Sequence, residues 1–129
     1  MSAADTDRVD GQLRLSKGAW LFRPAALDVL LRVEPAPAPA REGFLARDVR
    51  ARLAVSPTAV RRAPAPVSIA PRTGVPEEIA GVVCAREGDD LVVDAGIRVV
   101  VRGAARDGPA IGEPVVVDVD TAHGVRCVL

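Results

Sequence analysis

Few side chains of this 129-residue chain have the types and spacing that catalysis requires. The one histidine, His123, precedes a glycine, which is typical of a turn, and the two cysteines are Cys84 and Cys127. Cys127 follows His123 by four residues, and four residues of extended strand separate two side chains by more than about 12 Å. A cysteine–histidine site needs its two groups within hydrogen-bond reach. We therefore predict no catalytic residue.

The acidic side chains and the cysteines also lack the spacing of a metal site. Asp89–Asp90 falls in a predicted turn, where aspartate favours local backbone hydrogen bonds. Asp118 and Asp120 share one face of a predicted strand, where cross-strand pairing with Arg98 or Arg102 is the simpler role. Neither cysteine belongs to a CxxC pair, and no glycine-rich phosphate loop is present. We expect no metal, no cofactor and two free, buried thiols.

The composition describes a neutral chain without a membrane-spanning segment. Seventeen Lys and Arg balance 17 Asp and Glu, whereas proteins held to nucleic acid by phosphate contacts usually carry a basic excess. No apolar run approaches the roughly 20 residues of a spanning helix, and the N-terminus does not have the order of a signal peptide. We expect a cytoplasmic protein with no membrane insertion and no nucleic-acid partner. The preference for Arg over Lys, with many Ala, Val, Pro and Gly, is typical of a bacterium with a GC-rich genome.

Residues 79–129 have the period-2 hydrophobic pattern of short antiparallel strands separated by turn residues. The positions predicted to face inward are apolar: Ile79, Val83, Ile97, Val99, Val101, Val115, Val117 and Val119. Several short strands of this kind suggest closure into an OB-like or SH3-like barrel. A block this small buries only a marginal core, so we expect further strands or a partner subunit to cover it.

The preceding residues divide into three predicted segments. Residues 1–10 are polar and predict a disordered tail. Residues 11–33 predict an N-terminal hairpin and strands, with a turn at Lys17–Gly18. Alternating prolines in residues 34–42 predict a stiff, extended linker. The predicted barrel then occupies residues 43–129.

Residues 44–62 fit two structures. As helices they resemble a bacterial helix-turn-helix, with Ser56 as the cap and Pro57 in the first position of the second helix. Arg61 and Arg62 would then contact DNA, which gives the alternative function of a DNA-binding transcriptional regulator.

As strands, the same residues continue the period-2 pattern of the rest of the chain. Val49, Leu53 and Val55 then lie on one face, and arginines lie on the other. Pro64 and Pro66 would end the second helix after about seven residues, which is short for a recognition helix.

In the strand interpretation, four runs of the chain resemble the TOBE domains: Leu53 to Ser68, Ile79 to Val83, Asp90 to Gly96, and Ile111 to Val115. These domains follow the ATPase of bacterial molybdate, sulfate and sugar importers, and some stand alone as molybdate-binding proteins. The resemblance covers about residues 50–129. It implies an OB-like barrel that binds a small oxyanion.

The family's ligand-binding signature would fall on Ser68, Arg72 and Thr73, which we take as the candidate ligand-binding residues. Thr73 stands where the oxyanion binders have Asn. Near the last strand, Asp118 and Asp120 stand where molybdate binders often carry Lys, and a carboxylate disfavours a bound anion.

The sequence therefore predicts an all-β protein, a small OB/TOBE-like barrel with an additional N-terminal hairpin. We expect it to act as a non-enzymatic binding or interaction module. Because a valine-rich edge needs cover, we expect a homo-oligomer or a larger protein complex. A structural accessory subunit that docks by an edge strand is the remaining alternative.

Overall fold

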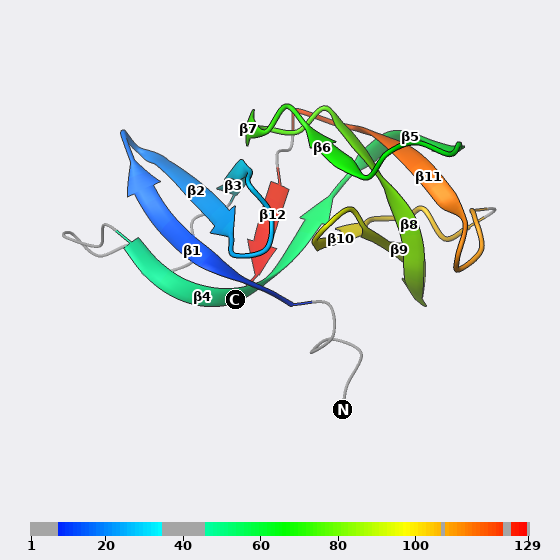
Figure 1. The fold of residues 1–129 in the computed structure, drawn as a ribbon, viewed down its shortest axis with the longest axis horizontal. Helices are drawn as coiled ribbons and strands as arrows, with labels where there is room; N and C mark the ends of the chain where they lie inside the picture. The colour runs from blue at the N-terminus through cyan, green and yellow to red at the C-terminus, as the bar shows by residue number, and fades with distance from the viewer. Residues whose placement is uncertain (1–7, 35–45, 107, 123–124, 129) are drawn as a thin grey trace.

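The computed structural model describes residues 8–34, 46–106, 108–122 and 125–128, and their regular structure is entirely β-sheet (Figure 1). The all-β prediction is thus confirmed, and no helix long and apolar enough to span a membrane occurs in the described residues. The strands are β1 (Val9–Ser16), β2 (Ala19–Pro24), β3 (Leu30–Glu34), β4 (Ala46–Val55), β5 (Pro57–Arg62), β6 (Ser68–Ala70), β7 (Thr73–Gly74), β8 (Glu78–Glu87), β9 (Asp90–Asp94), β10 (Arg98–Val101), β11 (Pro114–Val119) and β12 (Val125–Val128).

Five strands close into a small barrel, which we call the closed ring: β1, β2, β3, β12 and β4. β1 pairs with β2 on one side and with β4 on the other. β2 pairs with β3, and β12 completes the ring between β3 and β4. The predicted N-terminal hairpin is therefore present as β1 and β2, turning at Lys17–Gly18, and it forms part of the barrel wall.

Close packing inside the closed ring depends on one glycine. Phe22 is fully buried, and a Cβ atom placed on Gly11 would lie 2.5 Å from the Phe22 ring and 2.5 Å from the backbone oxygen of Arg23. Gly11 thus lets β1 and β2 approach each other around an aromatic ring that a larger residue would displace.

A second group of strands, which we call the open ring, continues the sheet from the end of β4. Its order is β4, β10, β9, β8, β11 and β5, and the path ends at β5. β6 adds to β8, and β7 adds to β3 of the closed ring. All the positions predicted from the period-2 pattern to face inward in residues 79–119 are buried, so that prediction is confirmed.

Strand β4 joins the two rings (Figure 1). Leu53 is fully buried and pairs with Cys127 of β12 on one side and with Val99 of β10 on the other. The buried residues of both rings form one continuous hydrophobic cluster. The rings therefore share a core although only one of them is closed.

The helix-turn-helix predicted as the alternative for residues 44–62 is wrong, because residues 46–62 form β4 and β5. Ala51, Leu53 and Val55 are buried in strict alternation with more exposed residues, which a strand satisfies and a helix does not. Residues 44 and 45 lie outside the described residues.

The segment boundaries predicted near the N-terminus differ slightly from those of the strands. β1 begins at Val9, so the last two residues of the predicted tail belong to a strand, and residues 1–7 lie outside the described residues. Glu34 ends β3, and residues 35–42 of the predicted linker also lie outside them.

Candidate functional site

The predicted ligand-binding residues lie on one short exposed segment. Ser68 is in β6, Arg72 is in the turn that follows, and Thr73 begins β7; all three are exposed. The backbone oxygen of Arg72 accepts a hydrogen bond of 2.7 Å from the N–H of Leu30, which fixes this segment against β3. The segment lines none of the three hollows described below. The oxyanion site therefore stays a prediction.

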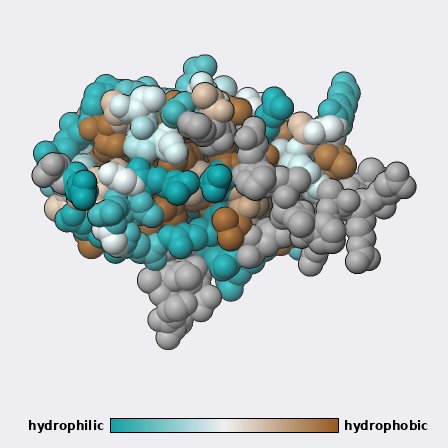
Figure 2. Space-filling model, turned by 180° about the vertical axis from the view of Figure 1, so that it is seen from behind, coloured by the Kyte–Doolittle hydropathy of each residue, from teal (hydrophilic) through white to brown (hydrophobic). Residues whose placement is uncertain are grey.

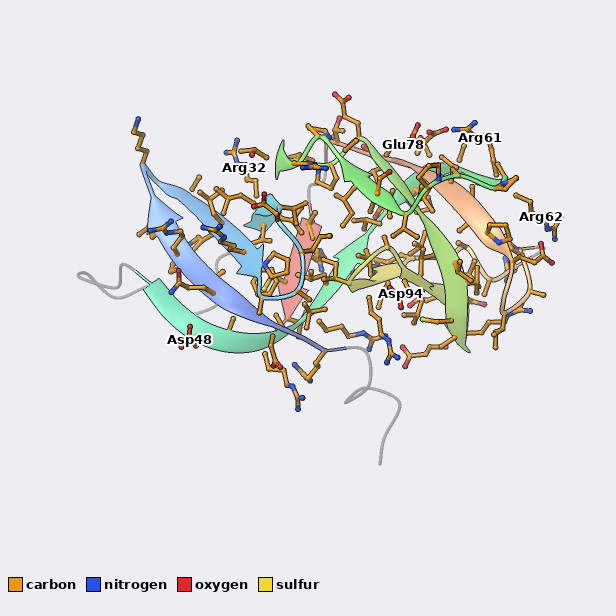
Figure 3. All side chains as sticks on the ribbon, viewed as in Figure 1. Arg32, Asp48, Arg61, Arg62, Glu78 and Asp94 are labelled. Carbon is orange, nitrogen blue, oxygen red and sulfur yellow. The ribbon has the colours of Figure 1, made fainter. Side chains whose placement is uncertain are left out.

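Arg61 and Arg62 lie on β5, and Arg61 lies near Glu78 of β8 (Figure 3). Arg61 Nη2 lies 3.4 Å from Asp118 Oδ1 and 3.8 Å from Glu78 Oε2. The arginine that pairs with Asp118 is thus Arg61 and not Arg98 or Arg102. The DNA contacts predicted for these residues required a helix, and that requirement is not met.

The side chain of Arg62 makes two contacts with the loop before β11. Its Nε lies 2.8 Å from Glu113 Oε2, and its Nη2 donates a hydrogen bond of 3.2 Å to the backbone oxygen of Gly108. These contacts hold the loop before β11 close to the end of β5.

Neither cysteine forms a disulfide, and Cys84 is half-buried whereas Cys127 is buried. Burial raises the pKa of the Cys127 thiol to about 11, so the thiol stays protonated near neutral pH and is a poor nucleophile. His123 lies outside the described residues. No group of three or more His, Cys, Asp or Glu side chains that could hold a metal gathers in the part of the chain that the structure describes.

β5 follows β4 after the single residue Ser56, and the edge of β5 beyond the end of β10 is unpaired because the chain after β10 turns away from it. The N–H of Arg102 donates to the backbone oxygen of Val55, where β10 leaves β4. The following residues bond to the β8–β9 turn instead: the N–H of Gly103 donates to Asp90 Oδ1 at 2.8 Å, and the N–H of Ala105 donates to the backbone oxygen of Asp89 at 2.9 Å. β5 is thereby left with one strand partner.

A hollow of about 370 Å³ opens where the pairing stops. It lies between β5 and the loop residues 103–106 and 108–109, and we call it the β5 seam. Its apolar lining includes Ala59, Val60, Ala104 and Pro109. The charged residues that line it, among those described, are Arg62 and Arg106.

The backbone of β5 presents unused hydrogen-bonding groups to this seam. The N–H of Ala63 donates to the backbone oxygen of Pro114. With the register of the two strands, this bond determines which residues of β5 are hydrogen-bonded to β11. In an antiparallel pair the bonded residues alternate, so Ala59 and Arg61 bond to β11 whereas the N–H and C=O groups of Val60 and Arg62 point away from it. Within the described residues, no hydrogen bond is found to the amides of Val60 and Arg62.

Two further hollows differ from the seam in character. One, of about 580 Å³, lies on the outer surface of the closed ring and is lined by charges of both signs, including the ion pair Asp10–Arg50 at 3.2 Å. Asp48, labelled in Figure 3, lines it from β4. Another, of about 360 Å³, lies between the start of β1 and the β9–β10 turn. Neither borders β5, which is the strand that ends the sheet.

Large exposed hydrophobic side chains are few among the residues that the structure describes. On the face seen in Figure 2, hydrophilic side chains are interspersed with small hydrophobic areas. The large exposed hydrophobic residues of the described chain are Val67, Val82, Ile111 and Val128. The β5 seam is therefore the strongest candidate site.

Comparison of the chain with protein-family models, with curated proteins and with solved structures finds no match. The resemblance to the TOBE domains thus has no independent support and stays a prediction.

Sequence reasoning did not identify the β5 seam, although one signal for it was present. Pro57 begins β5, and Pro64 and Pro66 follow it closely. Prolines at strand ends are typical of edge strands, because proline cannot donate to a ladder. Arg106 had no such signal, since its place beside β5 depends on where the loop turns.

Proposed function

We propose that the chain is a non-enzymatic interaction module that binds a protein partner through the β5 seam. The supporting observation is that β5 has one strand partner while its other edge faces an open hollow. Exposed edges accept added strands from other proteins, with main-chain hydrogen bonds supplying affinity and side-chain pockets supplying specificity. The high pKa of Cys127 fits a non-catalytic role, and free cysteines fit the reducing cytoplasm.

A selection from a library of random peptides tests this function, with the full chain as the target. Bound peptides are expected to change the amide NMR signals of Val60 and Arg62, because these groups face the seam. Signals from the outer surface of the closed ring, such as that of Asp48, should stay unchanged. A selection that yields no binder, or binders that affect only the closed ring, would contradict the proposal.

A second candidate function is the binding of a small oxyanion, favoured by the exposed Arg72 with two hydroxyl side chains, Ser68 and Thr73, on the same segment. A thermal-shift titration of the full chain with molybdate, tungstate and sulfate tests it. The hypothesis predicts a rise in melting temperature that Arg72→Gln abolishes and that the control Arg126→Gln, on the exposed face of β12, retains. The absence of any shift would exclude these three ions as ligands.

A further inference from the structure

We propose that the occupant of the β5 seam is an extended acidic peptide segment, which pairs with the free edge of β5 as an added strand. This inference rests on the proposed function and names the chemical class of the partner.

The backbone of β5 requires hydrogen-bond partners of strand type. The N–H and C=O groups of Val60 and Arg62 point from β5 toward the hollow, and an extended segment can supply acceptors and donors at the matching spacing. Six residues of strand are about 20 Å long, so β5 can guide a short segment of chain and not only a single small ion.

The side chains of the seam favour negative charge. Its described charged residues are Arg62 and Arg106, and none of its described lining residues is acidic. A guanidinium carries five N–H donors. Arg62 therefore keeps donors for a ligand carboxylate while it contacts Glu113 and Gly108. Arg106 is exposed and can pair with a second carboxylate.

The apolar lining specifies the rest of the segment. The hollow lies between β5, which carries Arg62, and the loop that carries Arg106. Its apolar lining is formed by Ala59, Val60, Ala104 and Pro109. Successive residues of a strand point to opposite sides, so a segment that alternates acidic and aliphatic residues would meet both kinds of lining.

A second copy of this chain fits the seam less well than a free segment does. In another copy, β5 is held by β11 on one edge and faces its own loop residues 103–106 and 108–109 on the other. Two seams brought together would place two such loops between the β5 strands. A segment without neighbours on either side avoids this obstruction.

Fluorescence polarisation with labelled eight-residue peptides tests the inference on the full chain. A peptide of alternating Glu and Val is expected to bind, and its affinity should fall as salt is raised. A peptide of alternating Lys and Val should not bind. A third peptide that keeps the Glu residues but replaces each Val with Pro should bind at least tenfold more weakly, because its prolines have no N–H to donate and are poorly tolerated in a strand ladder.

Two matched variants locate the binding. Arg106→Glu should weaken the Glu–Val peptide at least tenfold, because it reverses a charge that lines the seam. Arg126→Glu makes the same charge change on the exposed face of β12 and should leave the affinity within about twofold. Hydrogen exchange should show that the peptide protects the amides of Val60 and Arg62 while leaving those of Ala59 and Arg61 unchanged.

Equal binding of the Lys–Val peptide, or unchanged binding by Arg106→Glu, would overturn the inference. So would self-association of the chain that protects the same two amides without any peptide. Random-library binders that reach the seam but lack acidic residues would overturn the acidic partner and leave the proposed function in place. Failure of every peptide to reach the seam would remove both.

Discussion

The closed ring and the open ring share strand β4 but use their backbone hydrogen-bonding groups differently. In the closed ring each of the five strands has a partner on both sides, and β12 completes the circuit. In the open ring the series of hydrogen-bonded strands ends at β5, which pairs with β11 on one edge. The difference teaches that the unpaired strand edge on which the proposed function depends lies outside the closed barrel, because a closed barrel has no free edge.

The open state of the second ring has a local cause. Asp89 and Asp90 accept hydrogen bonds from the N–H groups of Ala105 and Gly103, respectively. Arg86 adds a hydrogen bond of 2.6 Å from Nη2 to the backbone oxygen of Ala105. Three interactions thus hold the loop against the β8–β9 turn and keep the seam open.

The largest predicted effect tests whether the two rings are one folding unit. Leu53→Ala should lower the free energy of unfolding by about 2–5 kcal/mol, because Leu53 is fully buried where the rings meet. Urea denaturation should still show a single transition. The control Val82→Ala, at a position that is 38% exposed, should change stability far less. Two separate transitions in Leu53→Ala would show that the rings fold independently.

A smaller effect concerns Cys127 in the closed ring at alkaline pH. Burial raises the pKa of this thiol from 9.0 to about 11, so the unfolded chain releases the proton first as pH rises. The stabilisation is complete below pH 9 and is lost between pH 9 and 11, by at most about 2–3 kcal/mol.

Urea denaturation at several alkaline pH values checks this loss against Cys127→Ala. The variant should have lower stability at neutral pH, because it lacks a buried side chain, but a flatter dependence on pH. An equal slope in the two proteins would mean that another group causes the alkaline loss.

The smallest predicted effect concerns the charges on β5. Arg61→Ala should change stability by no more than about 1 kcal/mol, because Arg61 is 55% exposed and its carboxylate partners lie 3.4 and 3.8 Å away. Arg52→Ala should cost more, since the Arg52–Glu87 pair is only 29% and 21% exposed. The reverse order would indicate that ion pairs, and not the backbone ladder with β11, hold β5 in place.

Local patterns in the sequence predicted much of the fold. Alternating apolar residues such as Val99 and Val117 predicted strands that are present and buried as expected. The β1–β2 hairpin followed from its turn at Lys17–Gly18. Residues 46–62 were ambiguous because Leu53 and Val55 satisfy either a strand or a short helix when neighbours are unknown, and pairing with β10 and β12 decides between them.

Ring closure and the candidate site could not be predicted in the same way. β12 pairs with β3 across most of the length of the chain, with Val125 opposite Val33, and no local pattern encodes that contact. The β5 seam depends on the absence of a pairing, which follows from the turn of residues 103–106 toward Asp89 and Asp90. The predicted residues Ser68, Arg72 and Thr73 followed the turn spacing of a resemblance and lie on a different segment.

Amide hydrogen exchange along β5 in the free chain tests the central claim most directly. The open ring predicts that Val60 and Arg62 exchange rapidly while Ala59 and Arg61, which bond to β11, exchange slowly. Equal protection of all four amides would contradict the account, because it would mean that both edges of β5 are already paired.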